Sequence, residues 1–251
     1  MAGSDEAPAR QPDRPHWKRV ILKLSGEALA EPSGFGLDTN VLRQVALEIK
    51  DVRDNLHIDI AVVVGGGNFW RGLKGAGQGM DQAQADFMGM IATVMNGLAL
   101  QDALERVGQY SRVMTAVEMP KVAEPYIRRR AERHMEKGRV VIFAGGTGNP
   151  FFTTDTAASL RAIEINADIL VKATKVNGIY SADPMKDPKA VRYPRLTFDR
   201  VLDERLNVMD ATSIVMCRDN KIPLQVYNMN NAGDLLRIAR GEDVGTVVTN
   251  D

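Results

Sequence analysis

Six short runs rich in Val and Ile recur along the chain, and each is continuously apolar rather than alternating. Continuous apolar runs of strand length are typical of strands that are covered on both faces, as in a parallel sheet. The runs cover residues 19–25, 58–64, 139–145, 167–174, 223–229 and 245–250. This pattern favours a fold built around a buried and largely parallel sheet.

Stretches with helical spacing separate these runs. Val41, Val45 and Ile49 recur every four residues after Asp38, a residue type that caps helix N-termini. Further helical patterns cover about residues 81–106, 121–137, 155–166, 210–219 and 231–240. Alternating strands and helices predict an α/β sheet sandwich. Because no linker or internal repeat follows position 18, residues 19–251 are predicted to form one domain.

Two segments bear on targeting. Residues 1–18 are interpreted as a disordered N-terminal tail rather than a signal peptide, because the first 15 mix charges, Pro, Ala and Gly with no apolar run. The longest uncharged stretch, residues 87–101, is too short and too polar to span a bilayer, and it predicts a buried helix. Its Met88, Met90 and Met95 leave a subunit interface as the alternative.

Charge and cysteine content exclude several classes of protein. The 32 Lys and Arg residues balance 32 Asp and Glu residues, which argues against a nucleic-acid binder and against a polybasic membrane-surface protein. The single cysteine, Cys217, gives no sign of an oxidising compartment and indicates a cytoplasmic protein. His16, His57 and His134 are scattered, so no protein metal site is predicted.

Glycine is concentrated in two windows, residues 65–79 and 145–148, which hold nearly half of the 22 glycines. Each window follows an apolar run, and a third turn, at Ser25 and Gly26, follows the first run. A glycine turn between strand and helix exposes backbone N–H groups that bind phosphate oxygens. Because the carboxyl ends of parallel strands share one edge of a sheet, these turns predict a crevice for several phosphates.

Familiar nucleotide motifs do not account for these turns. The chain contains no GxxxxGK[ST] sequence, and the GxGxxG pattern that begins at Gly65 and Gly67 is broken by Trp70. Lys23 strengthens the phosphate interpretation, because a lysine inside the apolar run VILKLSG is costly to bury without an anionic partner. A structural ion pair with a neighbouring carboxylate is the alternative.

The segment TGNPFFTTD, residues 147–155, combines a glycine turn, a proline, two aromatic residues, two hydroxyls and a carboxylate before a predicted helix. Thr153 and Thr154 can cap that helix and donate to a phosphate, while the two phenylalanines offer apolar surface to a base or ribose. A helix capped by Thr154 or Asp155, with a hydrophobic staple, is the plainer alternative.

A further loop, residues 173–184, places Tyr180 to cover an adenine ring and Asp183 to accept a hydrogen bond. Its Asn-Gly and Asp-Pro dipeptides are also ordinary turn signals, so a purely structural turn remains the alternative.

Seven segments together resemble the bacterial UMP kinases, a family of the amino acid kinase superfamily. They are KLSGEAL, VVVGGGNFWRG, DFMGMIATVMNGLALQDAL, GGTGNPFFTTDTAA, KATKVNGIYSADP, VMDATS and GTVV, within about residues 19–250. The resemblance implies a three-layer αβα sandwich without a P-loop, and transfer of the ATP γ-phosphoryl group to UMP in de novo pyrimidine nucleotide (CTP) biosynthesis. It also implies Mg²⁺ held mainly by ATP phosphates, a cytoplasmic homohexamer assembled as a trimer of dimers, activation by GTP and inhibition by UTP.

The resemblance assigns residues to sites. The ATP site takes Lys23, Leu24, Ser25, Gly26, Gly67, Arg71, Thr174, Tyr180 and Asp183. The UMP site takes Gly66, Asp86, Thr147, Gly148, Asn149, Pro150, Phe151, Phe152, Thr153 and Thr154. A segment that departs from the usual family sequence aligns with the GTP-response region; it comprises Glu31, Pro32, Ser33, Gly34, Phe35 and Gly36.

Within this assignment Lys23, Arg71 and Asp155 are the catalytic candidates. Lys23 stabilises the transferred phosphoryl group with help from Arg71, and Asp155 orients Lys23, because the UMP phosphate is already ionised and needs no base. The alternatives are a carbamate or amino-acid kinase of the same superfamily and a non-catalytic nucleotide-sensing or storage protein on the same fold.

Overall fold

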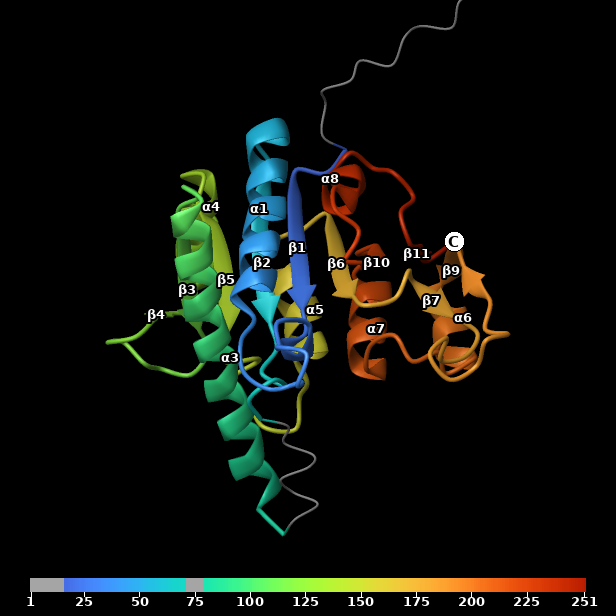
Figure 1. The fold of residues 1–251 in the computed structure, drawn as a ribbon, viewed down its shortest axis with the longest axis horizontal. Coiled ribbons are helices and arrows are strands. Elements are labelled where there is room, and N and C mark those ends of the chain that lie inside the picture. Colours follow the sequence, from blue (N-terminus) through green and yellow to red (C-terminus); the bar gives the residue numbers. More distant parts are fainter. Residues whose placement is uncertain (1–15, 71–78) are drawn as a thin grey trace, which may run out of the picture.

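The computed structural model describes residues 16–70 and 79–251, so residues 1–15 of the predicted tail and Arg71 lie outside the described residues (Figure 1). The strands are β1 (Arg19–Leu24), β2 (Asp59–Val64), β3 (Ser111–Thr115), β4 (Glu124–Pro125), β5 (Val140–Ala144), β6 (Ile169–Thr174), β7 (Ile179–Tyr180), β8 (Arg192–Tyr193), β9 (Arg195–Thr197), β10 (Leu224–Asn228) and β11 (Thr246–Thr249). In the described chain, nine of them form one sheet in the order β4-β3-β5-β2-β1-β6-β10-β11-β9, and β7 pairs with β8.

The large sheet is parallel except where β10 meets β11. β1 lies near its centre, with Val20 paired to Ile169 on β6 on one side and to Ile60 on β2 on the other. The six predicted strands are therefore confirmed as the central part of a mainly parallel sheet. The sequence missed β3, β4 and β9 of this sheet and the pair of β7 and β8, all of which are short.

Two helical layers cover the sheet (Figure 1). The helices are η1 (Gly26–Ala28), α1 (Thr39–Leu56), α3 (Gln82–Arg106), α4 (Arg128–Glu136), α5 (Thr154–Glu164), α6 (Phe198–Asp203), α7 (Ala211–Asp219) and α8 (Asp234–Ala239). α1, α3 and α8 share one buried apolar cluster with Leu22 and Leu24 of β1, whereas α4 to α7 share another with Ile21. Successive side chains of a strand point to opposite faces, so one strand contributes to both layers. The predicted three-layer αβα sandwich is confirmed.

Helix ends follow local capping chemistry. Asp38 caps α1 as predicted, because its Oδ1 accepts hydrogen bonds from Asn40 N at 2.8 Å and from Val41 N at 3.3 Å. The helix predicted over residues 121–137 is wrong in its first half, where the chain forms the edge strand β4. Pro125 lies in that strand, and proline lacks the N–H that a helix interior requires.

The N-terminal boundary of the packed domain lies before residue 19. Trp17, which the sequence placed in the tail, donates from Nε1 to Ile238 O at 3.1 Å and packs against the cluster that contains α1, α3 and α8. Residues at the end of the predicted tail therefore belong to the packed structure.

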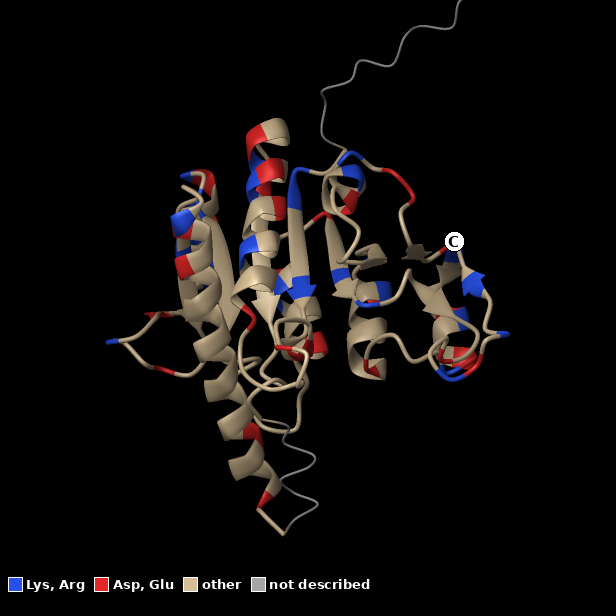
Figure 2. Ribbon diagram, in the orientation of Figure 1, with Lys and Arg blue, Asp and Glu red and all other residues tan. Residues whose placement is uncertain are grey.

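Helix α3 is only partly a core helix. Its Met90, Val94 and Leu100 are buried, but Ile91 and Met95 are each 47% exposed. The N-terminal half of α3 extends past the edge of the sheet, and Figure 2 shows few charged residues along it. In the described chain α3 alone is long and apolar enough to cross a membrane by length and composition, and 44% of that stretch is buried within the protein. The prediction of a buried helix holds for one face of α3 only.

Two leucines that differ in burial should contribute very differently to the stability of the protein. Leu22 in β1 is 1% exposed, and Leu47 in α1 is 43% exposed. We expect Leu22→Ala to lower the free energy of unfolding by about 2–5 kcal/mol, because it removes apolar contacts and leaves a cavity. Leu47→Ala, the matched control, should change it by less than about 0.5 kcal/mol in urea denaturation. Equal losses would contradict this description of the core.

Candidate active site

Three loops meet at the carboxyl edge of the sheet, at the lower side of Figure 1. They follow β1, β2 and β5 and contain residues 25–26, 65–67 and 145–148. The first two loops are in direct backbone contact. Gly65 N donates to Leu24 O at 2.8 Å, and a Cβ on Gly26 would lie 2.5 Å from Gly67 N, which only glycine permits. The predicted gathering of glycine turns at one sheet edge is confirmed.

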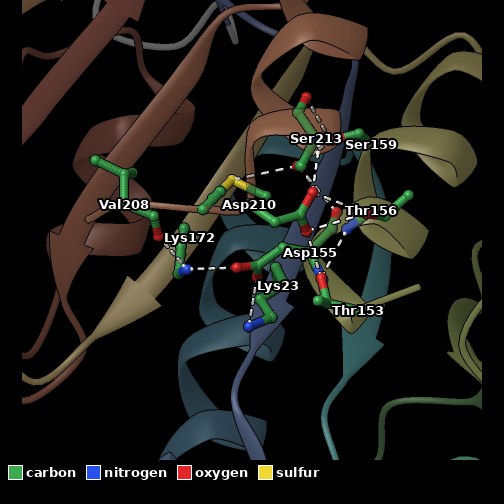
Figure 3. A network of polar contacts seen from close by, with 10 residues as sticks. Lys23, Thr153, Asp155, Thr156, Ser159, Lys172, Val208, Asp210 and Ser213 are labelled. Carbon is green, nitrogen blue, oxygen red and sulfur yellow. Dashed lines mark hydrogen bonds and ion pairs between the residues drawn. The ribbon is translucent and has the colours of Figure 1, made fainter. Parts of the chain in front are cut away.

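Lys23 is buried at the end of β1, and its Nζ lies 2.7 Å from Asp155 Oδ1 (Figure 3). Asp155 belongs to the first turn of α5, so the lysine and the carboxylate come from two different layers. The sequence left open whether the anionic partner of Lys23 is a phosphate or a carboxylate. In the structure Asp155 holds the ammonium group in place at the end of its strand.

A second lysine reaches the same carboxylate. Lys172 on β6 is the register partner of Lys23, so both side chains leave the sheet on the face that carries α5. Its Nζ lies 2.9 Å from Asp155 Oδ2 and also donates to Val208 O. One carboxylate therefore bridges two lysines, and the three side chains together carry an excess of one positive charge.

Burial and charge oppose one another in this cluster. Burial raises the pKa of Asp155, but the charges of Lys23 and Lys172 outweigh it, and the net pKa lies below its ordinary value. Burial also lowers the pKa of Lys172, and the attraction of Asp155 compensates only in part. A buried, fixed excess of positive charge is the arrangement that stabilises transferring phosphoryl groups.

The start of α5 is capped by Thr153, whose Oγ1 accepts from Asp155 N at 3.0 Å and Thr156 N at 3.3 Å. The alternative cap residues Thr154 and Asp155 are therefore wrong. Thr153 Oγ1 also donates to Asp210, and Thr156 Oγ1 lies 2.9 Å from Asp210 Oδ1. Because Asp210 itself caps α7, it joins the starts of two helices beside the lysine–carboxylate cluster (Figure 3).

The loop before α5 is tied to α3 by Asp86. Its Oδ2 accepts from Phe151 N at 2.8 Å, and Gln82 Nε2 donates to Oδ1 at 3.0 Å. Phe151 has a φ of 70°, an unusual conformation for a phenylalanine, and its side chain is 74% exposed. The Asp86 carboxylate holds this strained turn and leaves both phenylalanine rings at the surface.

A cavity of about 190 Å³ lies between these elements. Its lining includes six residues that the resemblance assigned to UMP, namely Gly66, Asp86, Thr147, Phe152, Thr153 and Thr154. It also includes Gly67, which was assigned to ATP. Gly148, Asn149, Pro150 and Phe151 form the turn beside it without lining it.

A larger cavity of about 400 Å³ lies at the carboxyl end of β6. Thr174, Tyr180 and Asp183, the three residues assigned to the ATP nucleoside, all line it. Val208 lines it as well, and its carbonyl accepts the hydrogen bond from Lys172. The lysine–carboxylate cluster thus connects the two cavities, through Thr153 and Thr154 on one side and Val208 on the other.

The remaining predicted residues lie near this centre. Leu24 is buried, and Ser25 Oγ accepts from Ala28 N at 3.2 Å at the start of η1. Residues 31–36 form a largely exposed loop in which the Phe35 ring makes an edge contact with Phe69 at 5.8 Å between centroids.

Lys172 of the cluster and Asp210 beside it were not identified from the sequence. Lys172 lies in the apolar run ILVKAT, and the same argument that singled out Lys23 would have found it. Asp210 lies in the segment VMDATS, where it reads only as a helix cap. Its contact with α5 depends on how two distant helices pack.

Carboxylates for a metal are scarce here. Among the described residues, no group of three or more His, Cys, Asp or Glu side chains is placed to hold a metal ion. Both oxygens of Asp155 already face lysines. The donor set therefore does not fit a metal held by the protein alone at the cluster.

The fold and the cluster define a kinase scaffold without a P-loop, and residues 18–228 match the amino acid kinase family. The chain belongs to that family. A uridylate kinase of Methylococcus capsulatus is 56% identical over 234 residues, which are 93% of this chain and 98% of the relative. Within the family the chain is a member of the UMP kinase branch, and it is a phosphotransferase.

Solved structures agree with this membership. A UMP kinase from Bacillus anthracis superposes with a TM-score of 0.89 at 39% identity, covering 94% of this chain and 97% of that one. A UMP kinase from Ureaplasma parvum gives 0.85 at 33% identity, covering 92% and 98%. A uridylate kinase from Archaeoglobus fulgidus gives 0.70 at 30% identity, covering 92% and 99%.

The shared carboxylate predicts a pH-dependent loss of stability. Asp155→Asn leaves Lys23 and Lys172, whose side chains are 7% and 13% exposed, without their anion, which should lower the free energy of unfolding by about 3–5 kcal/mol at pH 7. Without Asp155 the pKa of Lys172 falls further below the value of 10.5 that it has in the unfolded chain. Since the folded variant then sheds that proton more easily than the unfolded chain, its deficit should shrink as the pH rises toward that value.

Urea denaturation at pH 7 and at alkaline pH checks this expectation. Asp54→Asn is the matched control, because it breaks the exposed pair with Lys50 and should cost less than about 1 kcal/mol. A deficit for Asp155→Asn that is the same at both pH values would contradict the role given to Lys172.

Proposed function

We propose that this protein transfers the γ-phosphoryl group of ATP to UMP and releases ADP and UDP. One observation carries the proposal: the lysine–carboxylate cluster of Lys23, Asp155 and Lys172 is hydrogen-bonded to Thr153 in the lining of the smaller cavity and to Val208 in the lining of the larger one. The names of the relatives support UMP as the phosphoryl acceptor.

On the donor side, ATP would occupy the larger cavity with its adenosine against Thr174, Tyr180 and Asp183. Its phosphates would extend toward Lys23 and the glycine turns at Gly26 and Gly67. Glycine turns and a lysine at a strand end are the elements that bind phosphates when no P-loop is present. Leu24 and Ser25 complete this loop, and Arg71 is proposed to assist from outside the described residues.

On the acceptor side, UMP would occupy the smaller cavity. Thr153 and Thr154 lie at the N-terminus of α5, where the positive end of the helix dipole favours a phosphate. Asp86 and Gly66 also line this cavity, and the Asp86 carboxylate would accept hydrogen bonds from the ribose hydroxyls. Residues 147–152 would enclose the nucleoside.

In the reaction an oxygen of the UMP phosphate attacks the γ-phosphorus of ATP. The bond to the β,γ-bridging oxygen breaks, and that oxygen leaves on ADP with its electron pair. No proton has to be removed, because the attacking phosphate is already ionised. The ammonium group of Lys23, held by Asp155, stabilises the negative charge that spreads over the transferred group, and this is the main task of the protein.

Mg²⁺ is proposed to enter with ATP. At the cluster both oxygens of Asp155 are engaged by lysines, so the phosphate oxygens of the substrate are its expected ligands. When bound, the ion would neutralise phosphate charge, while Lys23 and the backbone amides of residues 65–67 position the chain of phosphates.

The resemblance to the UMP kinases also underlies our proposals for regulation and assembly. We propose a cytoplasmic homohexamer, a trimer of dimers, that supplies UDP for pyrimidine nucleotide biosynthesis, is activated by GTP and is inhibited by UTP. The exposed apolar face of α3, with Ile91 and Met95, supports self-association, because monomeric soluble proteins rarely expose a large apolar patch. Residues 31–36 are the proposed GTP-response segment, and their contact with Phe69 places them beside the glycine turn.

Removing the lysine tests the chemistry. We expect Lys23→Met to lower kcat for UMP phosphorylation on the order of 10²–10³-fold, because one charge that stabilises the transition state is lost. Lys50→Met, at a partly exposed lysine on α1 that lies outside both cavity linings, should leave kcat near the wild-type value. A coupled assay of ADP release with ATP and UMP measures both. Wild-type turnover in Lys23→Met would refute the assignment, and phosphorylation of carbamate or an amino acid without UMP activity would refute the substrate.

A charge on α3 tests the assembly. Ile91→Asp places a carboxylate in the exposed apolar face and should convert the proposed hexamer into smaller species, because burying that charge between subunits is costly. Leu47→Asp, on the exposed side of α1, should keep the wild-type mass. Native mass spectrometry measures the mass of the assembly in both variants. An Ile91→Asp assembly of the wild-type size would show that this face of α3 does not form a subunit interface.

A further inference from the structure

Two asparagines are fully buried behind the glycine turn that follows β2. Asn68 is 1% exposed and Asn96, in the middle of α3, is 0% exposed. Asn68 Nδ2 donates to Asn96 Oδ1 at 3.0 Å, and Asn96 Nδ2 donates to Asn68 Oδ1 at 2.7 Å. The two side chains thus form a closed amide pair inside a predominantly apolar layer.

The second hydrogen of each amide nitrogen leaves the pair toward a different loop. Asn68 Nδ2 donates to Gly36 O at 2.7 Å, and Asn96 Nδ2 donates to Gly65 O at 2.6 Å. A backbone hydrogen bond from Gly36 N to Asn68 O, at 3.2 Å, joins the same two segments. All four amide hydrogens are therefore used, and the pair joins three segments: residues 31–36, the glycine turn and α3.

The pair also touches the loop after β1. A Cβ on Gly26 would lie 2.5 Å from Asn68 Oδ1, so the side chain of Asn68 packs directly against that glycine. Gly26 follows Lys23 by three positions, and residues 65–67 line the smaller cavity in part. One amide pair thus fixes the relative position of two loops that are placed to meet phosphates.

Packing alone gives no reason for this arrangement. Two apolar side chains of similar shape in place of a buried hydrogen-bonded pair often leave stability unchanged, so stability alone does not require the two amides. What the amides add is hydrogen bonds of defined direction. A directional and fully satisfied network specifies one geometry. The outer hydrogen bonds of the pair end on the backbone carbonyls of Gly36 and Gly65. The network therefore specifies the geometry of the 31–36 segment and of the glycine turn after β2.

We propose that the Asn68–Asn96 pair positions residues 65–67 for the nucleotide phosphates and couples them to residues 31–36. Asn96 is a positioning residue, since it acts through the carbonyl of Gly65. This inference rests on the proposed function for its kinetic consequences. Its structural part, the coupling of three segments, holds in the free protein and is tested separately.

Asn96→Asp is the sharpest substitution, because it replaces the donating nitrogen with an oxygen that faces Gly65 O and Asn68 Oδ1. Burial among acceptors raises the pKa of such a carboxyl group, and only its protonated form donates a hydrogen bond. We expect kcat/KM for ATP to be about tenfold lower than in the wild type at pH 8. The ratio of variant to wild type should recover as the pH falls, a profile that a merely structural loss does not produce.

Hydrogen–deuterium exchange of the protein without nucleotides provides the second readout. In Asn96→Asp the amides of residues 65–70 and of the 31–36 segment should exchange faster at pH 8 than in the wild type. Asn40→Asp, at an exposed position in the first turn of α1, is the matched control and should change neither exchange nor activity.

Phe35→Ala covers the case in which Asn96→Asp does not fold. It removes an exposed ring that contacts Phe69, and it should speed exchange in residues 65–70 while the protein remains folded. Unchanged exchange in a folded Asn96→Asp or, failing that, in Phe35→Ala would overturn the inference. Absence of UMP phosphorylation by the wild type, with the exchange results as expected, would instead overturn the proposed function.

Discussion

The active centre depends on one carboxylate that two lysines share, one of them buried and the other largely buried. Asp155 faces Lys23 on β1 and Lys172 on β6, and these two lysines are register neighbours in the sheet. Two ammonium groups on adjacent strands would repel one another in a buried position without an anion between them. The first turn of α5 supplies that anion, so strand register, helix position and local charge are mutually dependent.

The same helix start connects the centre to its surroundings. Thr153 caps α5 and donates to Asp210, which caps α7, while Lys172 donates to the carbonyl of Val208 just before α7. The lining of both cavities is therefore bonded to the lysine–carboxylate cluster. The positions of α5 and α7 are therefore set by the same bonds that reach the two linings.

Much of the fold was predictable because its signals are local. Continuous Val and Ile runs identified six strands of the sheet, and Asp38 marked the start of α1. The position of the candidate site was also predictable from local signals. A lysine within an apolar strand and glycine turns directly after such strands stand out in the sequence, and both lie at the carboxyl edge of the sheet. Where Pro125 interrupted a helical pattern, the local signal of proline should have outweighed the spacing of apolar residues.

The amino-acid sequence by itself determined six strands of the sheet and most of the long helices, and it placed a cation and three glycine turns at strand ends. The tertiary structure alone decided which groups meet there. Lys23 and Lys172 become neighbours through parallel pairing of β1 with β6, and Asn68 finds Asn96 through the packing of α3 on the sheet. Such contacts depend on register and on helix placement between segments far apart in the chain, and local periodicity carries no information about either.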